Sequence, residues 1–167
     1  GMAISDINSF YNIVNNSVDP APNTPAGHEL TFLRYISQQT QQYASVIKDA
    51  ASKVTTQVTY PTGNSLADQL KIVARLIKGG LQTRVYMVNF GGFDTHSAQV
   101  NSSDTTTGSH ANLLGNVSRA IKAFQDDLKF LDIEERVIGM TYSEFGRRVL
   151  SNGSTGTDHG AAAPLFV

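Results

Sequence analysis

Two short apolar runs, each followed by a glycine-containing polar turn, constrain the fold of this chain more than any other feature. Residues 85–88 lead into a turn at residues 91–96, and residues 137–140 lead into a turn at residues 143–148. Short buried strands that end in polar loops are typical of an open α/β sheet, in which ligands bind beyond the carboxyl ends of the strands. The pattern therefore predicts that the two turns meet at one edge of a sheet.

Helical patterns alternate with these runs. Ser65 is the predicted N-cap of a helix whose apolar residues repeat at i, i+4 and i+7 and which ends at a Gly-Gly pair. A strand at residues 84–90 follows, then a helix that opens at His110, then a strand at residues 136–142. The order helix, strand, helix, strand predicts an α/β fold with a central, mostly parallel sheet and helices on both faces.

A proline-rich linker divides the sequence near its N-terminus. Residues 1–25 form an N-terminal segment, with a short helix expected at residues 4–16 before prolines that disfavour helix. Residues 26–167 form a single α/β domain that begins with a long helical pattern at residues 26–54. Residues 164–167 resemble the start of one more strand. We therefore expect the chain to be part of a longer protein, truncated at the C-terminus.

The composition excludes several classes of function. Only 16% of the residues are charged and the net charge is -1, so the sequence predicts no nucleic-acid partner. The chain has no cysteine, which excludes disulfides and thiolate chemistry. No apolar run approaches the roughly 20 residues of a membrane span. The sequence predicts neither an oligomeric state nor, by itself, a cellular location.

Side chains that bind metals gather in and beyond the two turns. Asp94 and His96 are two residues apart in the first turn, and Asp158 and His159 are neighbours flanked by glycines. Carboxylate oxygens and imidazole nitrogens together suit Zn, Mn or Fe. Glu144, in the second turn, is a candidate further ligand or general base.

Arg147 is the candidate substrate-binding residue, because its fork of donors matches a phosphate or sulfate oxyanion. Simpler interpretations remain open. The spacing of Asp94 and His96 is also that of a hydrogen bond that stabilises a turn. Glu144 and Arg147, at i and i+3, are also spaced as a solvated ion pair. His110 is either a residue that starts its helix or a further side chain that lines the site.

Four segments together resemble a known family. They are residues 85–99 (VYMVNFGGFDTHSAQ), 110–114 (HANLL), 141–147 (TYSEFGR) and 156–160 (GTDHG). In this combination they resemble the bacterial family called domain of unknown function 1501, which is placed in the alkaline phosphatase and sulfatase superfamily. The resemblance covers nearly all of the chain after the linker.

The resemblance implies a hydrolase scaffold with two metals, Zn or Mn, at the strand ends. Asp94 and His96 correspond to the first ligand pair, and His159 corresponds to a late histidine. The chain departs from the superfamily where it has Glu144 and Phe145, because the superfamily has Asp-His-Gly there and Phe145 cannot replace a histidine ligand. The superfamily's Ser or Thr nucleophile has no counterpart that we can identify. Relatives of this kind are often exported, so the resemblance implies a periplasmic or exported location.

Two functions follow as expectations. The first is a metal-dependent hydrolase of a phosphate or sulfate ester, with a small-molecule ester or a glycan as substrate, in which Asp94, His96, Glu144 and His159 hold the metal. The second is a non-catalytic binding or assembly module that keeps the hydrolase scaffold, as the missing nucleophile and Phe145 indicate.

Overall fold

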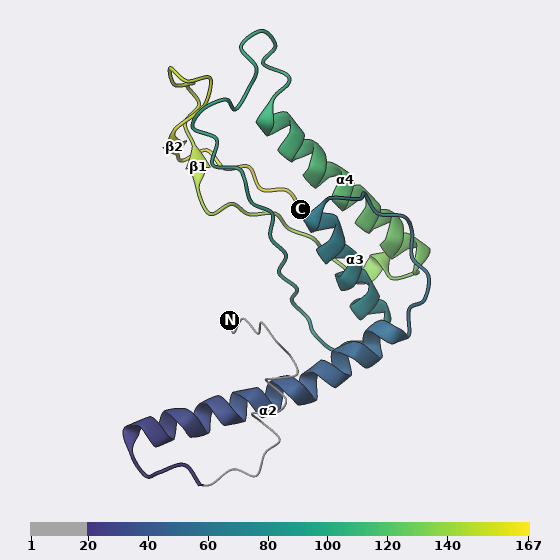
Figure 1. Cartoon of the computed structure of the whole chain (residues 1–167). Coiled ribbons are helices and arrows are strands. Elements are labelled where there is room, and N and C mark those ends of the chain that lie inside the picture. The colour runs from purple at the N-terminus through teal and green to yellow at the C-terminus, as the bar shows by residue number, and fades with distance from the viewer. Residues whose placement is uncertain (1–19) are drawn as a thin grey trace. The chain divides into compact units, whose positions relative to one another are not determined.

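The structure, a computed structural model, describes residues 20–167. It divides into two units, Gly1–Asp49 and Ala50–Val167. Most of the described part of the first unit is helix α2, Pro25–Ser52, whose last turn belongs to the second unit (Figure 1). This helix confirms the helical pattern in the sequence. The helix expected at residues 4–16 lies outside the described residues.

Helix α3, Ser65–Lys78, begins one residue earlier than the sequence indicated, because Asn64 and not Ser65 is its N-cap. The Asn64 side-chain oxygen accepts hydrogen bonds from the backbone N–H groups of Leu66 and Ala67. Its amide also donates to the carbonyl of Asn116. A buried asparagine therefore starts α3 and ties it to the next helix.

Two glycines end α3 for two different reasons. A Cβ on Gly79 would lie 2.0 Å from the carbonyl oxygen of Ala50, so only glycine fits there. Gly80 has a φ of 85°, in the left-handed region, and its N–H donates to the carbonyl of Ile77. The N–H of Leu81 then donates to the carbonyl of Leu76, which completes a Schellman motif.

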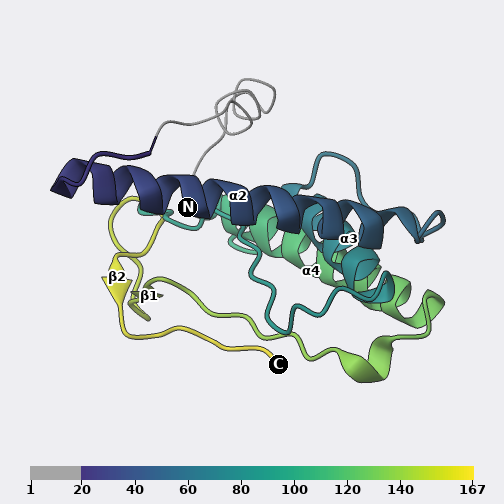
Figure 2. The same ribbon diagram turned by 90° about the horizontal axis from the view of Figure 1, so that it is seen from below.

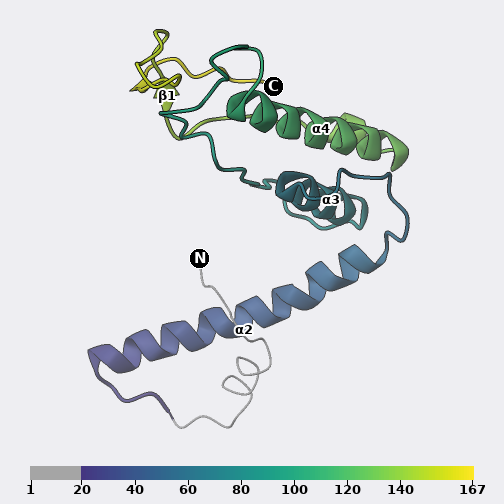
Figure 3. The same cartoon turned by 45° about the horizontal axis from the view of Figure 1, so that its top comes forward.

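Helix α4, Ser109–Phe130, lies beside α3 and builds the core with it (Figures 1 and 3). Its buried face repeats at helical spacing and includes Ala120, Phe124 and Leu128. Buried side chains from the loops before and after the two helices join this core. They include Tyr60, Leu131 and Ile133. The core of the second unit is thus a helix pair closed by loops.

The predicted α/β fold with a central, mostly parallel sheet is wrong. Among residues 20–167 the only sheet is a two-stranded antiparallel pair, β1 (Gly146–Arg147) and β2 (His159–Gly160). The predicted strand at residues 84–90 is not paired in a sheet. The start of the predicted strand at residues 136–142 contains the end of a short 3-10 helix, η1 (Glu134–Arg136).

The reason is that an apolar run selects a buried face but not a backbone partner. In the first run Val88 packs against the helix core, whereas Val85 is 82% exposed. The backbone of Asn89 exchanges two hydrogen bonds with the side-chain amide of Gln69 on α3, in the place where a neighbouring strand would pair. One face of this run is therefore packed against the helices, but its backbone forms no hydrogen-bonded ladder with a neighbouring strand.

The β1–β2 pair lies near the N-terminal end of α4, away from η1 (Figures 1 and 2). Gly146 faces Gly160 and Arg147 faces His159 across the pair. A Cβ on Gly146 would lie 2.4 Å from the carbonyl oxygen of Gly160, so the strands approach too closely for a side chain. In the part of the chain that is described, no helix is long and apolar enough to cross a membrane.

Candidate metal site

Two loops that are distant in the sequence are joined to form the site. The N–H of Ala98 donates to the carbonyl of Ser154, and the N–H of Gln99 donates to that of Thr155. The side-chain amide of Asn152 donates to the carbonyl of His96 at 2.7 Å. These bonds hold the turn at residues 93–99 against the loop at residues 151–160.

Three of the predicted ligands meet where the loops join. Oδ1 of Asp94 lies 3.0 Å from Nδ1 of His96 and 2.8 Å from Nε2 of His159. One ligand atom from each residue lies within 4.8 Å of the others. The two imidazole rings are 4.8 Å apart between centroids. The structure thus gathers one carboxylate and two imidazoles around a single point.

The charge state of Asp94 suits a metal ligand. The hydrogen bond with His159 lowers the pKa of the Asp94 carboxyl, and the nearby charges of His96 and Arg147 act in the same direction. Desolvation of the carboxylate opposes them and is smaller than the effect of the His159 hydrogen bond. Asp94 is therefore an anion at neutral pH, which is the form that binds cations. Its side chain is 59% exposed and each histidine 49%, so the cluster opens to solvent.

Arg147, the predicted substrate-binding residue, lies against the same cluster from β1. Its guanidinium donates to the carbonyls of Thr157 and Phe93 and lies 3.3 Å from Oδ1 of Asp94. It also lies over the ring of Phe145, 5.1 Å from the centroid. The side chain is only 16% exposed. Its contacts within the protein are therefore with both loops of the site.

The other predicted site residues lie outside the cluster. Glu144 is exposed and does not belong to the group of converging ligand atoms. Asp158 accepts a hydrogen bond from the amide of Asn152 through Oδ1. His110, in the first turn of α4, packs edge-to-face on Phe93, and its Nδ1 has no hydrogen-bond partner among the described residues.

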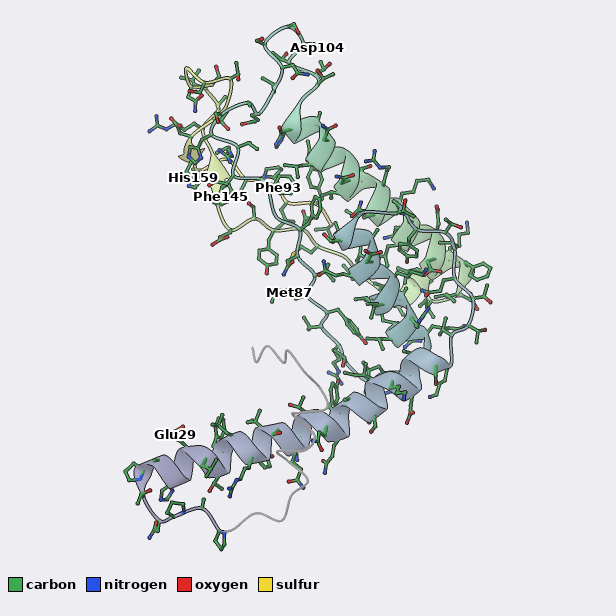
Figure 4. The ribbon with its side chains drawn as sticks, in the orientation of Figure 1. Glu29, Met87, Phe93, Asp104, Phe145 and His159 are labelled. Atoms are coloured by element: carbon green, nitrogen blue, oxygen red, sulfur yellow. The ribbon has the colours of Figure 1, made fainter. Side chains whose placement is uncertain are left out.

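Two residues contribute to the site in ways that the sequence analysis does not predict. Phe145 cannot replace a histidine ligand, but its ring stacks on that of His159 at 4.4 Å and 13° (Figure 4). Asn152 is not among the predicted residues, and its side-chain oxygen accepts from the N–H groups of Ser154 and Gly156 while its amide reaches the other loop. Asparagine before glycine is a turn signal that could have identified it.

An open groove of about 440 Å³ borders the same loops. Its lining contains hydroxyl and amide side chains but no charged one. Examples are Ser102, Thr105, Ser151 and Asn152. More of the lining surface is apolar than polar.

Comparisons with known proteins identify the family but not an activity. A search of curated proteins found no match to the chain, and neither did a search of solved structures. One family model, described as "Protein of unknown function (DUF1501)", matches residues 15–167, which is most of the chain. These residues include both loops of the candidate metal site. The chain therefore belongs to the DUF1501 family.

Proposed function

We propose that this chain holds one divalent transition-metal ion between Asp94, His96 and His159, and that the site serves the hydrolysis of a phosphate or sulfate ester. The observation that carries the proposal is the convergence of three ligand atoms from two loops, with Asp94 and His159 separated by 65 positions in the sequence. Chance proximity in one turn could bring two of them together, but not the third.

The donor set fits such an ion. One carboxylate oxygen with two imidazole nitrogens suits Zn or Mn. Donors around a tetrahedral zinc ion stand roughly 3.3 Å apart when each bond is about 2.0–2.1 Å long. The 2.8 Å and 3.0 Å separations from Asp94 need to open by about half an ångström or less to reach that spacing. The three ligand atoms lie within 4.8 Å of one another, so the two histidine nitrogens would have to move closer together to complete that geometry.

The exposure of the site supports catalysis over a purely structural role. Structural zinc sites close with four protein ligands, whereas catalytic sites keep a coordination position open. Here three protein ligands converge and each is about half exposed. A divalent ion at this point would supply Lewis-acid polarisation of a phosphoryl or sulfuryl oxygen.

The ester part of the proposal is supported by the motifs. The segments around Asp94 and His159 resemble those of the alkaline phosphatase and sulfatase superfamily, whose members cleave such esters. The groove beside the loops has no charged side chain in its lining and would take the uncharged part of an ester. The superfamily's sheet is not part of the proposal, because the described chain does not contain it.

Metal binding tests the proposal directly. Purified protein, stripped with a chelator and incubated with Zn²⁺ or Mn²⁺, is expected to retain about one ion per chain in elemental analysis. Asp94→Ala and His159→Ala should lose it. His28→Ala is the matched control, since His28 lies on α2 outside the cluster. Retention of no ion by the wild-type protein would refute the metal site. Metal-loaded protein that cleaves neither p-nitrophenyl phosphate nor p-nitrophenyl sulfate would count against the ester chemistry.

A second candidate function is a non-catalytic assembly module, and one observation favours it. The two apolar runs expose large side chains toward solvent: Val85 at 82%, Met87 at 75% and Ile138 at 87%. The Tyr142 hydroxyl contacts the sulfur of Met87, so the runs lie near each other. Neighbouring apolar side chains of this kind mark interaction surfaces.

The two candidates give opposite results in one comparison. In an assembly module, Asp94→Ala and His159→Ala lower the melting temperature and leave the metal content unchanged. Ile138→Ser would then reduce self-association in analytical ultracentrifugation without lowering the melting temperature. For a metal site the same substitutions at Asp94 and His159 abolish metal retention.

A further inference from the structure

Arg147 connects the two loops that carry the metal ligands. One terminal nitrogen of its guanidinium donates to the carbonyl of Thr157, two residues before His159. The other donates to the carbonyl of Phe93, immediately before Asp94. Because a planar guanidinium holds its donors in a fixed fork, one side chain sets the separation of the two loops.

The backbone of Arg147 contributes to the same connection. Arg147 is the cross-strand partner of His159 in the β1–β2 pair. Its N–H and carbonyl also exchange hydrogen bonds with Ala162, at 2.8 Å and 3.1 Å. The residue is therefore anchored on the His159 side by its main chain and reaches the Asp94 side with its side chain.

A stack of three side chains orients the imidazole of His159. The ring of Phe145 lies 4.4 Å from that of His159 and is tilted by only 13°. The guanidinium of Arg147 lies over the same phenyl ring at 5.1 Å. The ring of His159 is half exposed, and its other contacts are the ring of His96, 4.8 Å away, and the hydrogen bond with Asp94. The stack with Phe145 adds a fixed ring plane to these contacts and keeps Nε2 of His159 toward Asp94.

We propose that Arg147 and Phe145 are positioning residues of the metal site: Arg147 holds the two ligand loops at a fixed separation, and Phe145 sets the ring plane of His159. This inference rests on the proposed metal-binding function. It assigns Arg147 to the ligands and not to the substrate. An oxyanion bound by Arg147 would have to compete with two backbone carbonyls and Asp94 for a side chain that is mostly buried.

Metal affinity of suitable variants provides the first test. Arg147→Lys keeps the charge but loses the fork, and Phe145→Leu keeps an apolar side chain but loses the stack. We expect each to weaken Zn²⁺ binding by about 10- to 100-fold, as for other residues that orient metal ligands. Arg148→Lys is the matched control, because Arg148 is exposed and bonds to Asp158 through its backbone N–H. Zn²⁺ is titrated against a chromophoric chelator, with no substrate present.

Zn²⁺ affinity in Arg147→Lys equal to that of the wild-type protein overturns the inference. A separate titration of the Zn²⁺-loaded proteins with inorganic phosphate then shows the alternative role: weaker phosphate binding in Arg147→Lys would assign Arg147 to a substrate oxyanion.

Hydrogen exchange on metal-free protein separates failure of this inference from failure of the metal site. In Arg147→Lys we expect faster exchange of the amides of Ala98 and Gln99, which donate to the carbonyls of Ser154 and Thr155 on the other loop. Amides in the middle of α3 and α4 should be unchanged, whereas a general loss of stability would accelerate them too. If the wild-type protein retains no metal, the proposed function fails, and faster exchange confined to the loops still supports the connection through Arg147. Equal exchange in both proteins overturns it.

Discussion

At the scale of single residues, the site depends on positions where a side chain cannot be accommodated. Gly156 is buried where the two ligand loops touch. A Cβ there would lie 2.2 Å from the carbonyl oxygen of His96 and 2.4 Å from its carbon. Both atoms belong to the backbone and cannot rotate away. The absence of a side chain at Gly156 is thus a condition for the approach of His96 to His159.

Gly156→Ala should therefore push the loops apart. We expect it to lower the free energy of unfolding by about 1–3 kcal/mol, as overpacking generally does, and to weaken Zn²⁺ binding. Gly153→Ala in the same loop is the control, because a Cβ on Gly153 meets nothing within 4 Å. Urea denaturation and Zn²⁺ titration measure the two effects. Equal stability of the two variants would show that the loops do not touch at Gly156.

Asp104 offers a prediction about pH. Its carboxylate accepts hydrogen bonds from the hydroxyl and the N–H of Thr106, at 2.6 Å and 3.0 Å, and these lower the pKa of Asp104 below the ordinary 3.8. A lowered folded-state pKa means that ionised Asp104 stabilises the loop at any pH above the unfolded-state pKa. The contribution is lost as the pH falls through the folded-state pKa.

Carboxyl titration followed by NMR should therefore place the midpoint of Asp104 below 3.8. Thr106→Val removes the hydroxyl donor and should move the midpoint upward. A midpoint that is the same in both proteins would contradict the hydrogen bond from Thr106.

At the scale of elements, local sequence patterns predicted the helices correctly but did not predict the strands. The three helical patterns of residues 26–130 correspond to α2, α3 and α4 with small shifts at their ends. A helix satisfies its backbone within its own segment, so a local pattern suffices to predict it. A strand needs a second backbone that the pattern does not name. The apolar runs correctly indicated that Val88 packs against the core. The parallel sheet that they predicted is absent from the described residues.

Substitutions at the start of α3 test which residue is its N-cap. Asn64→Ala removes the acceptor for two N–H groups and the donor to Asn116. We expect the free energy of unfolding to fall by about 1–2 kcal/mol, the upper part of the range for N-caps. Ser65→Ala, one residue further, should change it by less than about 0.5 kcal/mol, because Ser65 is exposed. Thermal denaturation of both variants decides which residue is the cap.

At the scale of the whole molecule, a buried carboxylate connects the helix core of residues 50–167 to the loop before α3. Asp127 on α4 is 0% exposed. It accepts hydrogen bonds from the amide of Gln57, the N–H of Val58 and the hydroxyl of Tyr60. Burial and the hydrogen bond to Asp127 raise the pKa of Tyr60, which keeps its hydroxyl a donor.

Asp127→Ala should destabilise this unit strongly. It leaves buried donors without an acceptor, and each such group costs about 1–3 kcal/mol, so we expect a loss of about 3 kcal/mol or more. Asp126→Ala is the adjacent control. It removes only an exposed i, i+4 pair with Lys122, worth about 0.5 kcal/mol at most. Similar denaturation midpoints for the two variants would show that the network around Asp127 contributes little.

The helices, the Gly-Gly end of α3 and the candidate ligands could all be recognised in the sequence, because each of these features depends on neighbours within a few positions. Which of the candidate ligands converge became clear from the contacts between the loops. The sequence predicted both Glu144 and His159 as ligands, but β1–β2 pairing and the bonds from Asn152 and Arg147 bring only His159 to Asp94. Contacts between loops more than fifty residues apart leave no local periodicity, so the spacing of residues did not show that Glu144 would stay outside the cluster.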